Sequence, residues 1–104
     1  MSLSISGDFN EAEDLWLLKL SGEIDISNAH HLKKQLETAY EQTRANIAID
    51  LADLNYIDST GLGVIIGAYG VMRGAGHRII LRRPKENVKK LLRITSLDKV
   101  LCKE

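Results

Sequence analysis

The chain has 104 residues, of which 44% are hydrophobic and 27% charged, as expected for one globular domain spanning residues 1–104. Fourteen basic side chains balance fourteen acidic ones, so no net field attracts nucleic acid or an anionic membrane. Cys102 is the single cysteine, and no apolar run approaches the ~20 residues of a membrane span. These features predict a small cytoplasmic protein without membrane insertion, and they favour a monomer.

The first 43 residues predict two strands and a helix. Residues 2–9 alternate small polar with apolar side chains, which indicates an edge strand, and the apolar run 14–22 predicts a second strand that forms a meander with it. Residues 28–43 change to a helical period, with Ser27 or Asn28 as the N-cap. The apolar stripe of this helix consists of Ala29, Leu32, Leu36, Ala39 and Tyr40.

The middle of the chain predicts a strand-helix-strand unit. Residues 46–51 are short, β-branched and apolar, as in a buried central strand. Residues 52–56 read as a polar connection in which Leu54 turns inward. A glycine-rich helix follows over about residues 60–75, and residues 78–83 predict the next strand.

The last segment predicts a helix and fixes the fold class. Pro84 suits the first turn of a helix, and residues 96–101 add one more turn. The element order β-β-α-β-α-β-α predicts an α/β fold, with one mixed sheet of about four to five strands and helices packed on it. The expected inner face of the last helix consists of Val88, Leu91, Leu92 and Thr95.

Six of the eight glycines lie between Tyr56 and Gly76, and four of them share one side of the predicted helix: Gly63, Gly67, Gly70 and Gly74. Each interior glycine costs a helix about 0.5–1 kcal/mol relative to alanine. Two explanations stay open: close packing against another helix of the chain, or a groove kept bare for a partner. The predicted core stripe is Leu62, Ile65, Ile66, Tyr69 and Met72, and beside the glycines lies a strip of Val64, Ala68, Val71 and Ala75.

A hydroxyl pair, Ser59 and Thr60, stands where this helix begins. Asp58, Ser59 or Thr60 can each cap the helix by accepting from free N–H groups of its first turn. The same place, between a central strand and a helix, is where open α/β sheets put their ligand chemistry. A phosphate on Ser59 would lie at the positive end of the helix dipole. It would therefore act by blocking a contact rather than by unfolding the domain.

The residue pattern argues against an enzyme. The residues around Ser59 do not match the G-x-S-x-G motif of a nucleophile elbow. The sequence also gives no sign that His30, His31 or His77 lies beside Ser59 as a general base. Residues 61–67, GLGVIIG, depart from the dinucleotide fingerprint, and no phosphate-binding loop with its lysine is present. The adjacent histidines are a weak metal signal. The sequence thus predicts no catalytic residue, cofactor or metal.

The segment YIDSTGLGVIIG closely resembles the signature of the STAS domain, in particular that of stand-alone bacterial anti-sigma factor antagonists. The resemblance extends over roughly residues 3–101, through LSGEIDISNAHHLKKQL and RRPKENVKKLLRITSLDKV. It implies a partner-switching regulator. The unphosphorylated protein would bind an anti-sigma factor that is also a serine kinase, and a sigma factor would be released. That kinase would use its own ATP, and a metal-dependent serine phosphatase would reverse the modification.

The same resemblance implies residue roles. Ser59 matches the phosphorylated serine, Thr60 is a minor acceptor, and the serine both caps the helix and acts as its switch. Asp25 matches the acid of the GEID turn near the phosphosite. The expected partner-binding residues are Asp25, Asp58, Ser59, Thr60, Gly61, Leu62, Gly63, Val64 and Gly67. The alternative is a STAS accessory subunit of a lipid or anion transport system that acts as a constitutive docking module.

Overall fold

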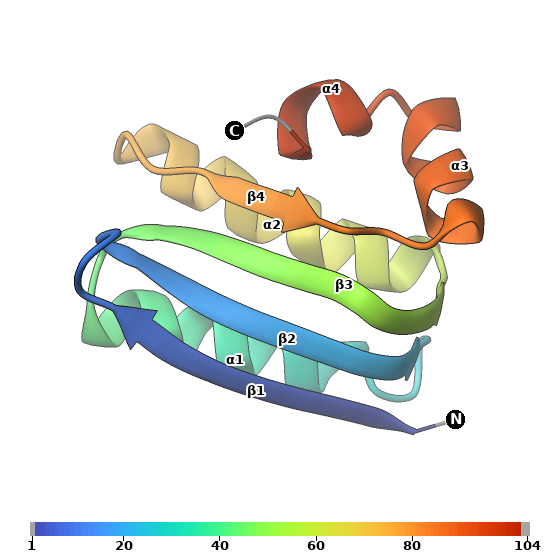
Figure 1. Cartoon of the computed structure of the whole chain (residues 1–104), viewed down its shortest axis with the longest axis horizontal. Coiled ribbons are helices and arrows are strands. Elements are labelled where there is room, and N and C mark those ends of the chain that lie inside the picture. Colours follow the sequence, from blue (N-terminus) through green and yellow to red (C-terminus); the bar gives the residue numbers. More distant parts are fainter. Residues whose placement is uncertain (1, 103–104) are drawn as a thin grey trace.

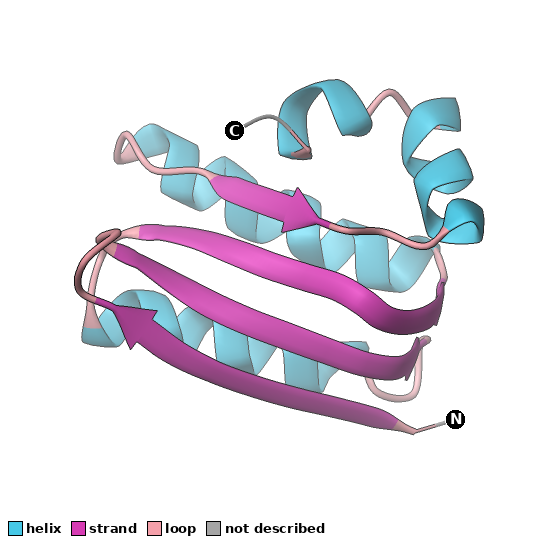
Figure 2. Cartoon of the chain, viewed as in Figure 1, coloured by secondary structure: helices cyan, strands magenta, loops and turns pink. Residues whose placement is uncertain are grey.

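The computed structural model describes residues 2–102, so the ends of the predicted domain, residues 1, 103 and 104, lie outside it. The element order is that predicted from the sequence, with the last helical segment split in two (Figures 1 and 2). The elements are β1 (Leu3–Asn10), β2 (Leu15–Ile24), α1 (Ala29–Gln42), β3 (Asn46–Ile57), α2 (Ser59–Gly74), β4 (Ile79–Arg82), α3 (Glu86–Ile94) and α4 (Asp98–Leu101).

The four strands form one mixed sheet in the order β1-β2-β3-β4. The hairpin strand β1 pairs antiparallel with β2, whereas β2 pairs parallel with β3 and β3 parallel with β4. The mixed α/β sheet predicted from the sequence is confirmed. Because the last three strands are parallel, their carboxyl ends meet at one edge, where α1 and α2 both begin (Figure 1).

One apolar core fixes the helices on the sheet. Helices α1 and α2 lie against the same face, and α3 and α4 pack beside β4 (Figure 1). Alternate residues of the strands enter this core with the predicted stripe of α1, which includes the buried Leu32 and Leu36. On the opposite face of the sheet, a small second cluster of Leu15, Ala48 and Ile80 is buried.

Strand β3 is longer than predicted. Residues 52–56 continue the strand instead of forming a connection, because they pair with the end of β2, where Ile24 lies opposite Ile57. Leu54 is fully buried, as predicted, while the polar residues between the buried positions face outward. Pairing across the sheet outweighs the low strand propensity of the polar residues.

Two predicted core positions are wrong. Ile66 is 45% exposed, since it lies at the margin of the α2 stripe, while Leu62, Ile65 and Met72 fill the core. Thr95 is exposed at the C-cap of α3, where its hydroxyl donates to the Leu91 carbonyl at 2.9 Å. The last helix also starts later than predicted, at Glu86, two residues after Pro84.

Candidate functional site

The predicted phosphosite lies where β3 passes directly into α2. Asp58 has an extended backbone and caps the helix: its Oδ1 accepts a hydrogen bond from the Gly61 amide at 3.0 Å. The prediction that Ser59 caps the helix is therefore wrong. Ser59 is instead the first helical residue, and both Ser59 and Thr60 are exposed. Since Asp58 performs the capping, the Ser59 hydroxyl is left accessible to a partner.

The turn that carries Asp25 lies beside this helix start. The Asp58 amide donates to the Ile24 carbonyl at 3.2 Å, which ties the end of β3 to the end of β2. The Asp25 carboxylate accepts from the Ser27 amide at 2.9 Å and from the Ser27 hydroxyl. The hydroxyl bond lowers the pKa of Asp25 below its ordinary value, against a smaller opposing effect of desolvation. The structure thus brings the start of the Asp25 turn to Asp58, the residue before Ser59, as the resemblance implied.

Four predicted partner-binding residues, Thr60, Gly63, Val64 and Gly67, line a groove between α1 and α2 with a volume of about 470 Å³. The rest of this α1–α2 groove is lined by Lys33, Leu36, Glu37, Tyr40, Ala68, Val71 and Met72. Its lining is mostly apolar, and it begins at Thr60, next to the phosphosite. Such a surface suits a ligand or an apolar segment of another protein.

The glycines of α2 fall into two groups. A methyl group added at Gly63, Gly67, Gly70 or Gly74 would meet no atom within 4 Å, so these glycines do not serve close packing within the chain. Of the two explanations left open by the sequence, the structure supports the bare surface. Gly61 differs, because its added methyl would lie 2.6 Å from Ile24 Cγ2.

Two residues predicted to bind a partner do not lie on the surface. Gly61 and Leu62 are both buried, and Leu62 belongs to the hydrophobic core. Their direct contact with a partner is therefore contradicted by burial. Both residues instead hold the first turn of α2 against the sheet, which sets the position of Ser59.

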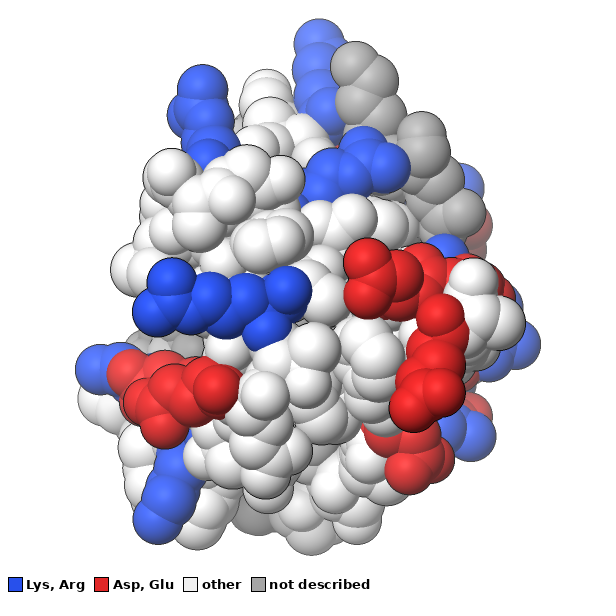
Figure 3. Space-filling model, turned by 90° about the vertical axis from the view of Figure 1, so that its left-hand side faces the viewer, with Lys and Arg blue, Asp and Glu red and all other residues white. Residues whose placement is uncertain are grey.

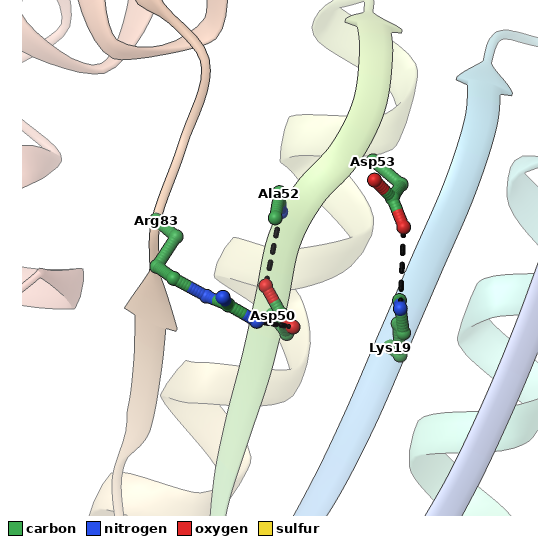
Figure 4. Close-up of polar contacts among 5 residues, drawn as sticks. All are labelled: Lys19, Asp50, Ala52, Asp53 and Arg83. Atoms are coloured by element: carbon green, nitrogen blue, oxygen red, sulfur yellow. Dashed lines mark hydrogen bonds and ion pairs between the residues drawn. The ribbon is translucent and has the colours of Figure 1, made fainter.

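The face of the sheet opposite α1 and α2 carries paired charged side chains. Asp50 accepts from the Ala52 amide at 3.0 Å and pairs with the Arg83 guanidinium, while Lys19 and Asp53 form an ion pair at 3.2 Å (Figure 4). Burial raises the pKa of Asp50, but the hydrogen bonds from Ala52 and Arg83, together with the positive charges of Arg83 and Lys19, outweigh it and lower the net pKa. By contrast, Arg73 is the one charged residue within α2.

The far end of the molecule, where β1 turns into β2, carries charges of both signs. Figure 3 shows acidic side chains in two groups, a larger one on the right and a smaller one at the lower left, with basic side chains between and above them. Within residues 2–102, no group of three His, Cys, Asp or Glu side chains is placed to hold a metal ion. None of the helices in that range has both the length and the apolar character needed to cross a membrane.

Sequence reasoning missed three features of the site. Ile26, in the Asp25 turn, is 79% exposed, and Tyr56, near the end of β3, is 42% exposed. Asn28, at the N-cap position of α1, makes no cap bond and is buried. A turn of a few residues has no periodicity, so no sequence pattern indicated which of its side chains faces solvent.

The comparisons with known proteins agree with this architecture. The model of the STAS domain matches residues 8–103. The anti-sigma-B factor antagonist of Bacillus subtilis (strain 168) is 32% identical over 99 residues, which cover 95% of this chain and 90% of that protein. This chain belongs to the STAS domain family. The anti-sigma F factor antagonist of Paenibacillus polymyxa is 29% identical over 82% of this chain and 74% of its own length.

Solved structures of anti-sigma factor antagonists share the fold. A candidate anti-sigma factor antagonist from Thermotoga maritima has a TM-score of 0.84 at 28% identity, covering 93% of this chain and 82% of that one. The anti-sigma factor antagonist SpoIIAA in its unphosphorylated form has a TM-score of 0.71 at 21% identity, over 86% of this chain and 82% of that one. At that level of identity the second likeness concerns the fold alone.

Proposed function

We propose that this chain is an anti-sigma factor antagonist that switches partners through phosphorylation of Ser59. The observation that carries the proposal is the accessible serine at the first position of α2, capped by Asp58 and followed at Thr60 by the α1–α2 groove. The STAS relatives named above are anti-sigma factor antagonists, which supports the same function.

The unphosphorylated chain binds an anti-sigma factor that is also a serine kinase, and a sigma factor is released. The contact includes Asp25, Asp58, Ser59 and Thr60, and it extends into the groove at Gly63, Val64 and Gly67. The kinase supplies the ATP, so the chain itself needs no cofactor and catalyses no reaction. A metal-dependent serine phosphatase resets the switch, and the chain acts in the cytoplasm as a monomer.

Phosphorylation of Ser59 weakens this contact by electrostatics rather than by unfolding. A phosphate adds about −1.5 to −2 charges beside the Asp58 carboxylate and next to a largely apolar groove. Binding a partner would then bury much of this charge in a largely apolar contact, which is costly. The helix itself tolerates the phosphate, because anions are stabilised at the N-terminus of a helix.

The test is intact-mass analysis with peptide mapping of the protein isolated from its native host, before and after stress. We expect a phosphate on Ser59 whose occupancy changes with stress, and no modification of a Ser59→Ala variant expressed at the same level. Thr60 is expected to carry phosphate at low occupancy. If neither residue is ever phosphorylated, the proposal fails, and a constitutive docking subunit becomes the better interpretation.

A further inference from the structure

The Asp25–Asn28 turn holds a buried amide side chain. Asn28 is 7% exposed, and it is the one buried polar residue in the part of the chain that the structure describes. Burying an amide is costly unless both of its ends are hydrogen-bonded. Asn28 Oδ1 accepts from the Asp25 amide at 3.0 Å, and Asn28 Nδ2 donates to the Glu23 carbonyl at 2.9 Å.

Both bonds lead away from the helix that Asn28 precedes. A residue at the N-cap position normally uses its side chain to satisfy amides of the first helical turn. Asn28 instead joins the last residues of β2 to the turn before α1. Its backbone amide also donates to the Asp25 carbonyl, at 3.2 Å. The Asn28 side chain therefore stabilises the shape of the turn rather than the helix.

The residue at the tip of this turn is Ile26. The hydrogen bonds from Ser27 to the Asp25 carboxylate span it, so its backbone is held from both sides. Its side chain is nevertheless 79% exposed. A single exposed apolar side chain is ordinary, and Ile94 on α3 is 70% exposed. What distinguishes Ile26 is the hydrogen-bonded turn that carries it, which begins directly after Ile24, and the Ile24 carbonyl accepts from the Asp58 amide at 3.2 Å.

We infer that Ile26 is an apolar anchor for the kinase that modifies Ser59, and that Asn28 is the positioning residue that presents it. Because hydrogen bonds already hold the backbone of this turn, less conformational entropy is lost when Ile26 is bound, and a few apolar anchors supply most of the affinity of an interface. The occupant of the surface is the same kinase that reaches Ser59, because Ile24, which precedes the turn, accepts a hydrogen bond from Asp58, which precedes Ser59. This inference rests on the proposed function and names a contact of the same site.

The experiment measures kcat and KM for phosphorylation of Ser59 by the host kinase, purified through that activity. The substrate variants are Ile26→Ser and, as a matched control, Ile94→Ser. Ile26→Ser should raise KM about tenfold or more with kcat nearly unchanged, since the lost contact positions the whole substrate. Ile94→Ser should behave as the wild type. Equal KM values for the two variants would show that Ile26 is not an anchor for the kinase.

The role of Asn28 is tested with Asn28→Ala alone and combined with Ile26→Ser. The single change should raise KM several-fold and accelerate hydrogen exchange of the Asp25 amide, while amides of β3 keep their protection. In the double variant the rise in KM should be smaller than the product of the two single effects, because Asn28 acts partly through Ile26. If the rise in KM of the double variant equals the product of the two single rises, Asn28 acts independently of Ile26, and its positioning role is overturned.

Different outcomes would exclude phosphorylation of Ser59 and the contact through Ile26. If the wild-type chain is never phosphorylated on Ser59, the proposed function fails and this inference with it. If Ser59 is phosphorylated normally and Ile26→Ser has the KM of the wild type, only the present inference fails. Ile26→Ser changes an exposed side chain and should fold normally, so the test does not depend on the stability of the Asn28 variants.

Discussion

The first turn of α2 and the three turns that follow differ in packing, although they belong to one helix. In the first turn Asp58 caps the amide of Gly61, and Gly61 itself is pressed against Ile24 and Ile57. In the later turns a methyl added at any glycine from Gly63 to Gly74 would meet no neighbouring atom. The comparison shows that glycine has two separate roles here: close packing at the start of the helix and a bare surface along the rest.

The bare surface has a thermodynamic cost that packing within the chain does not offset. Gly63, Gly67 and Gly70, the open glycines inside the helix, destabilise it by roughly 1.5–3 kcal/mol in total relative to alanine, a large fraction of the stability of a small domain. The tightly held first turn fixes the position of Ser59, and the open turns leave room for another molecule beside it. A rigid modification site next to an open groove is the arrangement that a contact-blocking switch requires.

The largest effect is expected for Ser59→Asp in the first turn. The added carboxylate should weaken kinase binding at least about 30-fold, which corresponds to roughly 2 kcal/mol, because it places a second negative charge beside Asp58 in the contact. Ser59→Ala should bind like the unmodified wild type. Titration calorimetry with the purified kinase measures both variants, and circular dichroism should show the same helix content. Equal affinities for Ser59→Asp and Ser59→Ala would contradict regulation by charge.

This difference within α2 was only partly predictable from the sequence. Helical spacing showed that Gly63, Gly67, Gly70 and Gly74 share a side, but spacing alone cannot tell whether that side meets a helix or solvent. The cap was ambiguous, since Asp58, Ser59 and Thr60 all have side chains that can accept from the first turn. The backbone conformation of Asp58, which decides it, is set by pairing with β2.

The helices and strands were easier to predict than the site. The stripe of α1 and the buried strands have strong periods, and the structure confirms them. The extension of β3 to Ile57 depends on its register with β2, which is a long-range property. The exposure of Ile26 and the inward bonds of Asn28 depend on a turn that carries no repeating pattern.

Gly61→Ala tests the tight packing of the first turn. The new methyl would lie 2.6 Å from Ile24 Cγ2 and 2.8 Å from Ile57 Cγ1, so neighbouring side chains must move. Overpacking of this kind should lower the free energy of unfolding by about 1–3 kcal/mol. Urea denaturation measures it, with Gly63→Ala as the control in open space. If Gly61→Ala were as stable as Gly63→Ala, the two groups of glycines would not differ.

Asp58→Ala tests the cap of the same turn. Loss of the acceptor for the Gly61 amide should lower the free energy of unfolding by about 1 kcal/mol, and Asp58→Asn should restore most of it. The measurement is again urea denaturation, combined with hydrogen exchange of the Gly61 amide. Unchanged exchange in Asp58→Ala would mean that another group caps the helix and that Ser59 is less accessible than the geometry indicates.

Gly67→Ala has the smallest expected effect on stability and is the sharpest test of the open turns. The methyl has free space, so alanine should raise the free energy of unfolding by about 0.5–1 kcal/mol through its helix propensity. Gly70→Ala should stabilise equally, but Gly70 does not line the α1–α2 groove, whereas Gly67 does. Affinity for the kinase should therefore fall in Gly67→Ala and remain unchanged in Gly70→Ala. If both variants bind as the wild type does, the partner does not enter the groove, and the contact is confined to the first turn and the Asp25 turn.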